Sequence, residues 1–148
     1  MTIEELYHQY QQSSGICTDT RKSVENSLFF ALKGEQFDGN RFVESALEKG
    51  CRLAISEREE LKGRQGVVSV TSTLSLLQEL ANYHRRQCAP RLLAITGSNG
   101  KTTTKEMAAA VIGQKLNTLS TFGNLNNEIG VPLTLFRLNH SHEAAILE

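Results

Sequence analysis

The sequence has no excess charge of either sign, because 16 lysine and arginine residues balance 16 aspartate and glutamate residues. No net field therefore attracts nucleic acid or an anionic membrane, and an anionic ligand must be held by local contacts. The sequence also lacks a long apolar run and a basic-then-apolar leader. We expect neither secretion nor membrane insertion, and we expect a cytoplasmic protein.

Cysteine is sparse, and its spacing excludes the common cysteine-rich sites. Cys17, Cys51 and Cys88 are odd in number and far apart, and no Cys-x-x-Cys pair or Cys/His ligand spacing occurs. Buried, reduced thiols fit this pattern best. Hydrophobic residues still make up 39% of the 148 positions, which is enough for one domain or two small ones.

The first 88 residues alternate between helical and strand patterns, which predicts a small α/β domain over 1–88. Thr2 and Glu5 indicate a capping box, while Asn40 and Ser72 are the expected N-caps of two further helices. We assign the aromatic residues Phe29, Phe30 and Phe42 to the core. The predicted helices are 3–12, 41–49 and 73–87, and the predicted strands are 16–19, 27–32, 51–55 and 67–70.

A second unit is predicted over 89–148, after the break at Ala89-Pro90. Its elements are strands over 92–96, 115–120 and 144–147 and helices over 102–113 and 131–137. Three strands are few for a nucleotide-binding sheet, so we expect the start of a larger parallel-sheet domain with an exposed apolar edge near 144–147. A small but complete domain is the alternative.

Residues 95–102 have the composition of a phosphate-binding loop between a strand and a helix. Gly-Lys-Thr at 100–102 matches the end of G-x-x-x-x-G-K-[ST], although the first glycine is displaced to Gly97. Glycines let the backbone approach a phosphate, and the following helix directs its N–H groups at the anion. Lys101 can reach the β- and γ-phosphates, and Thr102 can ligate Mg²⁺.

The predicted ATP site has one further element, Glu148, which follows the strand at 144–147. α/β folds place Mg²⁺ ligands at such strand ends, so Thr102 and Glu148 are the candidate metal ligands. The alternatives are a chance turn with a solvated lysine and a solvated glutamate. The candidate ATP-binding residues are Gly97, Ser98, Asn99, Gly100, Lys101, Thr102 and Thr103.

The segment Ala94–Met107 closely resembles the ATP loop of the Mur ligase family, which uses T-G-x-N-G-K-[ST]. Gly123–Thr134 resembles the loop that follows in the member that joins D-alanyl-D-alanine to UDP-MurNAc-tripeptide. Within it, Asn124–Pro132 argues against the member that adds the third amino acid. Three segments resemble the family's N-terminal uridine-nucleotide domain: Thr18–Lys22, Leu28–Gly34 and Phe37–Phe42.

This resemblance implies an ATP-dependent amide ligase with Mg²⁺, of which the chain is the first domain and the opening of the ATPase. ATP would convert the tripeptide carboxylate to an acyl phosphate, which the amine of D-alanyl-D-alanine then attacks. Lys101 would be the catalytic residue, because it offsets charge during phosphoryl transfer. A free-standing uridine-nucleotide-binding module without catalysis is the alternative. The implied substrate-binding residues are Thr20, Arg21, Asp38, Gly39, Asn40, Asn126 and Asn127.

The sequence departs from the family pattern at two positions. Asn26 stands where relatives usually carry glycine, and asparagine tolerates positive φ well enough for the turn to survive. Asn40 stands where relatives often carry histidine. It keeps a hydrogen-bonding side chain but cannot perform a role that needs imidazole.

Overall fold

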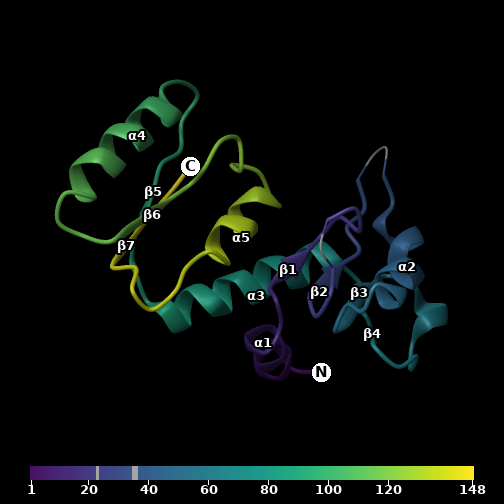
Figure 1. Cartoon of the computed structure of the whole chain (residues 1–148). Coiled ribbons are helices and arrows are strands. Elements are labelled where there is room, and N and C mark those ends of the chain that lie inside the picture. The colour runs from purple at the N-terminus through teal and green to yellow at the C-terminus, as the bar shows by residue number, and fades with distance from the viewer. Residues whose placement is uncertain (23, 35–36) are drawn as a thin grey trace. The chain divides into compact units, whose positions relative to one another are not determined.

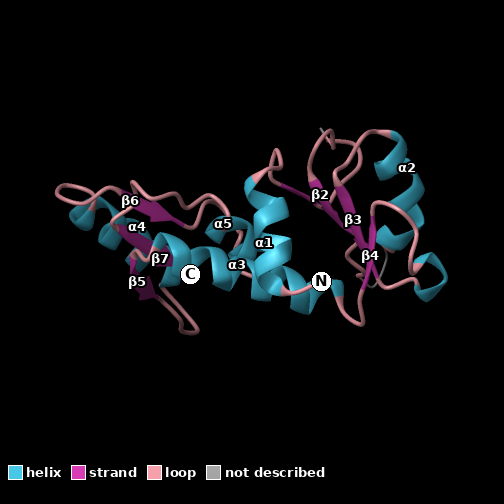
Figure 2. Ribbon diagram, turned by 90° about the horizontal axis from the view of Figure 1, so that it is seen from below, coloured by secondary structure: helices cyan, strands magenta, loops and turns pink. Residues whose placement is uncertain are grey.

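A computed structural model describes residues 1–22, 24–34 and 37–148. The chain divides into two compact units, Met1–Leu80 (the N-terminal unit) and Ala81–Glu148 (the C-terminal unit). Each unit has its own parallel sheet, as Figures 1 and 2 show. The α/β class predicted from the sequence is therefore confirmed. Positions 35 and 36 of the predicted polar turn lie outside the described residues.

The N-terminal unit is built on a four-stranded parallel sheet in the order β1-β2-β3-β4. Because the strands are parallel, all four carboxyl ends lie at one edge of the sheet. The predicted capping box is present, since Thr2 Oγ1 accepts the Glu5 N–H and the Glu5 carboxylate accepts the Thr2 N–H. The elements are α1 (Ile3–Gln11), β1 (Ile16–Cys17), β2 (Leu28–Phe30), the 3₁₀ turn η1 (Gly39–Phe42), α2 (Val43–Glu48), β3 (Leu53–Ser56), η2 (Glu59–Leu61) and β4 (Val67–Ser69).

The core of this unit lies between the sheet and α2. Phe29 and Phe30 are buried, as predicted, and α2 packs against β3. Asn26 has φ of +54°, and its amide donates to the Gln12 carbonyl, which confirms that the turn survives without glycine. Cys17 and Cys51 are buried with free thiols.

Two expectations about the segment before α2 are wrong. Asn40 is not the N-cap of α2, which begins after Phe42 without a side-chain cap. Asp38 instead caps the 3₁₀ turn η1, because its side chain accepts the Asn40 N–H. A 3₁₀ turn has about three residues per turn, so the side chains that follow do not point where an α-helix from Arg41 would place them. Phe42 is consequently 37% exposed instead of lying in the core.

The C-terminal unit is built on a three-stranded parallel sheet in the order β5-β7-β6. The long helix α3 (Thr73–Cys88), capped by Ser72 as predicted, runs across the division between the units. Helix α4 packs against β6 and β7 and lies alongside the strands in Figure 1. The remaining elements are β5 (Arg91–Ala94), α4 (Lys101–Ile112), β6 (Thr118–Ser120), α5 (Gly130–Leu135) and β7 (Ala144–Leu147).

The expected exposed edge near 144–147 is wrong. Strand β7 pairs on both sides and is buried at all four positions, because it lies between β5 and β6. The apolar surface is instead on β5, where Leu92 and Leu93 are 44% and 40% exposed. Within the described residues, no helix combines the length and apolar character needed to cross a bilayer.

Candidate nucleotide and substrate sites

The loop between β5 and α4 has the conformation that the sequence predicts for phosphate binding. Gly97 has φ of +149° and Gly100 has φ of +75°, values that residues with a side chain rarely adopt. Gly100 is the N-cap of α4, and the first amides of a helix have no intrahelical acceptor. Ser98 and Asn99 are exposed at the tip of the loop. Lys101 folds back over it, and its Nζ donates to the Gly97 carbonyl at 2.7 Å.

Glu148 follows β7, which pairs with β5, so its carboxylate comes beside the loop. Glu148 Oε1 accepts hydrogen bonds from Thr102 Oγ1 and from Asn126 Nδ2, each at 3.0 Å. The Asn126 amide, the Thr102 hydroxyl and the nearby lysines lower the pKa of this carboxyl against the effect of desolvation. Thr102, Asn126 and Glu148, all predicted from the sequence, therefore meet at one point.

Asn127 does not join this group. Its Oδ1 accepts the N–H groups of Ile129 and Gly130 at 3.1 and 2.7 Å, which stabilises the turn that leads into α5. The side chain therefore has a local structural role next to the site. Thr103, also predicted as an ATP contact, lies in the first turn of α4 and is exposed.

The oxygen atoms of Thr102 and Glu148 fit a magnesium ion better than a transition metal. Among the described positions, no group of three or more His, Cys, Asp or Glu side chains could hold a metal. Mg²⁺ takes few protein oxygens and completes its shell with water and phosphate oxygens. Glu148 Oε2 is buried and accepts no hydrogen bond, so one carboxylate oxygen has no hydrogen-bond donor.

Sequence reasoning missed Lys105, whose side chain is only 1% exposed although it is charged. It follows Lys101 by four residues on α4, so both lysines lie on one face of the helix. The four-residue spacing is visible in the sequence and places Lys105 near Lys101. The sequence does not show that Lys105 is buried, because its burial results from the packing of α4 against β6.

The N-terminal unit contains a separate pocket of about 180 Å³ at the carboxyl edge of its sheet. Its described lining combines two predicted residues, Thr20 and Arg21, with two aromatic residues that are not among the predicted site residues. The rings of Phe37 and Phe42 stack with centroids 5.4 Å apart and an interplanar angle of 11°. The described lining residues are Asp19, Thr20, Arg21, Phe37 and Phe42.

Asp38, Gly39 and Asn40 shape this pocket without lining it. A Cβ at Gly39 would lie 2.6 Å from the Leu32 carbonyl oxygen, so only glycine fits there. The Asn40 side chain is buried, and its Oδ1 accepts from Ser56 Oγ at 2.8 Å and from the Glu57 N–H at 3.0 Å. The segment is thereby fixed to the end of β3, which holds the two rings in place.

Comparison with known families decides the relationship of the chain. Residues 12–88 match the model described as Mur ligase family, catalytic domain, and residues 95–148 match the Mur ligase middle domain. The chain belongs to the Mur ligase family. The predicted resemblance is thus confirmed over both units.

Individual relatives of this Mur ligase chain share one name. This chain is 43% identical over 144 residues to the UDP-N-acetylmuramoyl-tripeptide–D-alanyl-D-alanine ligase of Bacillus subtilis. The match covers 95% of this chain and 32% of that protein. The Escherichia coli ligase of the same name is 45% identical over 134 residues, covering 90% and 29%. The chain therefore spans about a third of the length of these relatives.

Solved structures agree with this relationship. The MurF structure from Acinetobacter baumannii has a TM-score of 0.85 and 37% identity, covering 99% of this chain and 35% of that one. The Thermotoga maritima MurF ligase, solved in complex with ADP, has a TM-score of 0.85 and 30% identity, covering 95% and 32%.

The Asp19–Arg21 pair in this Mur ligase chain gives a testable pH effect. Hydrogen bonds from the Arg21 side chain and backbone lower the pKa of Asp19 to about 2. Because folding lowers the pKa of Asp19, the pair stabilises the fold fully at a pH above the ordinary pKa of 3.8. This stabilisation is lost as the pH falls toward 2. We expect Arg21→Gln to raise the pKa of Asp19 toward 3.8 in an NMR titration. Lys22→Gln is the control and should shift it little, and an unchanged pKa in Arg21→Gln would contradict the pairing.

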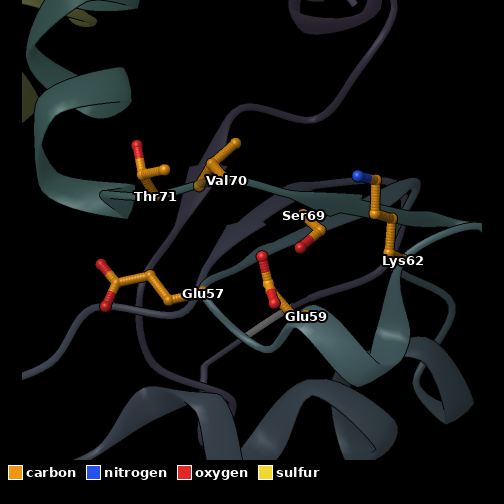
Figure 3. A pocket seen from close by; sticks show the side chains of 6 residues that line it. All are labelled: Glu57, Glu59, Lys62, Ser69, Val70 and Thr71. Carbon is orange, nitrogen blue, oxygen red and sulfur yellow. The ribbon is translucent and has the colours of Figure 1, made fainter.

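A second hollow of this Mur ligase chain, of about 380 Å³, lies at the ends of β3 and β4 and is shown in Figure 3. Glu57 lines it, but its Oε1 already accepts from the N–H and the hydroxyl of Thr73 at 2.8 and 3.0 Å. This carboxylate therefore stabilises the N-terminus of α3. The other lining residues are Glu59, Lys62, Ser69, Val70 and Thr71.

Proposed function

We propose that this chain supplies the uridine-nucleotide domain and the ATP phosphate loop of a cytoplasmic amide ligase. The ligase uses ATP and Mg²⁺ to add D-alanyl-D-alanine to UDP-MurNAc-tripeptide during peptidoglycan precursor synthesis. The observation that carries this proposal is the Glu148 carboxylate bonded to Thr102 beside a glycine loop of phosphate-binding conformation. The shared name of the relatives supports the choice of substrates.

The chemistry begins with the phosphates of ATP on the loop amides and the N-terminus of α4. Lys101 Nζ would exchange the Gly97 carbonyl for a phosphate oxygen and offset the charge of the transferring group. Thr102 and Glu148 would hold Mg²⁺, which neutralises charge on the phosphates. The tripeptide carboxylate attacks the γ-phosphorus as the bond to ADP breaks, and the amine of D-alanyl-D-alanine then displaces phosphate from the acyl carbon.

The pocket of the N-terminal unit suits a uridine nucleotide. A uracil ring can stack on the exposed pair formed by Phe37 and Phe42, and Arg21 can form charge-assisted bonds with the diphosphate. Stacking of a base on an aromatic ring contributes roughly 1–3 kcal/mol.

We expect Phe37→Ala to weaken UDP binding about tenfold, since each 1.4 kcal/mol corresponds to a factor of ten. Phe37 is 50% exposed, so its removal costs little folding stability. Calorimetric titration with UDP measures the effect. Phe122→Ala is the control, because Phe122 is a more exposed phenylalanine of the C-terminal unit. Equal affinities of Phe37→Ala and the original chain would refute the stacking role.

A second candidate function is a uridine-nucleotide-binding module without catalysis. It is favoured by the pocket near Thr20, whose described lining comes from the N-terminal unit alone. The test compares the 148-residue chain with the full-length protein in an assay for ADP release and amide formation. We expect UDP binding by both and product only from the full-length protein. UDP binding without any product from the full-length protein would favour the module, and product from the 148 residues alone would contradict the need for further domains.

A further inference from the structure

Lys105 is a buried charge that the proposed chemistry does not yet use. Its side chain is 1% exposed, whereas a charged group in a protein interior is costly unless it is paired and hydrogen-bonded. Lys105 Nζ donates to the Thr121 carbonyl at 2.7 Å and pairs with Glu106 Oε1 at 2.9 Å. Glu106 is itself 66% exposed, so it does not explain why the lysine points inward.

Thr121 connects Lys105 to the end of β7. Its side chain is buried, its N–H donates to the Ile146 carbonyl at 2.9 Å, and its Oγ1 accepts the Glu148 N–H at 3.1 Å. Thr121 also directly follows β6 and begins the loop that carries Asn126. The bond from Lys105 therefore fixes the residue that holds both the backbone of Glu148 and the start of this loop.

The charge of Lys105 acts on the same carboxylate. Glu148 Oε1 accepts from Thr102 and Asn126, while Oε2 accepts no hydrogen bond and lies 4.0 Å from Lys105 Nζ. The side chain of Glu148 is 3% exposed, so the attraction is screened less than at the surface. Oε1 accepts two hydrogen bonds, and the Lys105 ammonium lies on the side of Oε2. Together these contacts hold the carboxylate in a single orientation.

We propose that Lys105 is a positioning residue that orients Glu148 for a divalent cation beside the bound phosphates. The inference rests on the proposed function, because it assumes that Glu148 holds this cation. Lys101 and the loop amides receive the phosphates, whereas Lys105 contacts the strand ends behind them. Loss of Lys105 should therefore weaken cation binding and leave phosphate binding in place.

The experiment is an NMR titration of the 148-residue chain with ADP, with Mg²⁺ and without it. In the original chain we expect Mg²⁺ to tighten ADP binding, followed through the amide signals of Gly100 and Lys101. In Lys105→Met, which keeps the length of the side chain, we expect this tightening to fall by about tenfold or more. Affinity for metal-free ADP should change less than about twofold. Mn²⁺, used as a probe, should no longer broaden the Glu148 amide selectively.

Two further variants make the result decisive. Lys115→Met removes an exposed lysine and should behave like the original chain. Thr121→Val removes the acceptor of the Glu148 N–H, so it should also weaken the Mg²⁺ effect, and it decides the question if Lys105→Met does not fold. An unchanged Mg²⁺ effect in a folded Lys105→Met, or in Thr121→Val, overturns the positioning role alone. Binding of ADP by the original chain without any Mg²⁺ effect overturns the proposed metal site and this inference together.

Discussion

Lys101→Ala should lower amide formation by the full-length ligase about 10²–10³-fold or more while leaving the fold intact. The Lys101 ammonium bonds only a loop carbonyl among the contacts described, so its loss removes little folding stability. A lost charge-assisted hydrogen bond costs roughly 1.5–3 kcal/mol, and a contact made to the transition state is worth more. The measurement is the rate of ADP release that depends on both substrates. Lys115→Ala is the matched control, and near-normal turnover of Lys101→Ala would refute the catalytic assignment.

Gly130→Ala should unfold or strongly loosen the C-terminal unit. Gly130 begins α5, and a Cβ there would lie 2.5 Å from both the Cα and the carbonyl carbon of Leu125. These are backbone atoms, which cannot move aside as the end of a flexible side chain can. Overpacking of this kind costs roughly 1–3 kcal/mol and occasionally more. Asn126 adjoins the clash, so its bond to Glu148 should weaken too.

Thermal unfolding and amide hydrogen exchange measure the effect of Gly130→Ala. We expect faster exchange in β6 and β7 and unchanged exchange in β2 and β3, since each unit has its own sheet. Gly34→Ala is the control, because a Cβ there meets one atom at 3.9 Å, an ordinary contact. A variant Gly130→Ala that melts like the original chain would show that α5 can shift to accept the methyl group.

The elements of the fold could be predicted because their signals are local. The capping residues Thr2 and Ser72 and the apolar runs of β2 and β7 all act over a few positions. The strand order β5-β7-β6 could not be predicted in this way, since it depends on pairing between distant segments. For that reason the position of the exposed apolar edge was wrong. The domain boundary at 88/89 stays a prediction.

The candidate site follows the same rule. The glycine loop is contiguous, so its residues can be chosen from the sequence, whereas the bond between Thr102 and Glu148 joins positions 46 residues apart. The position of Glu148 at the end of a strand indicated that partner, because α/β folds place Mg²⁺ ligands there, and no periodicity did. Phe42 was wrongly assigned to the core because the apolar pattern predicts an α-helix where the structure has a 3₁₀ turn. Lys105 was missed because lysine side chains are usually exposed to solvent, whereas this one is buried. The roles of the individual site residues remain proposals.

The central place of β7 in its sheet has a consequence for how the protein is made. Ribosomes deliver β5 and β6 first, yet the two strands pair with β7 and not with each other. During synthesis both strands stay unpaired, and Leu92 and Leu93 stay accessible, until residues 144–147 have left the exit tunnel. Sheet formation in this unit therefore cannot begin before β7 emerges, and a growing chain held short of Ala144 exposes two unpaired strands to chaperones.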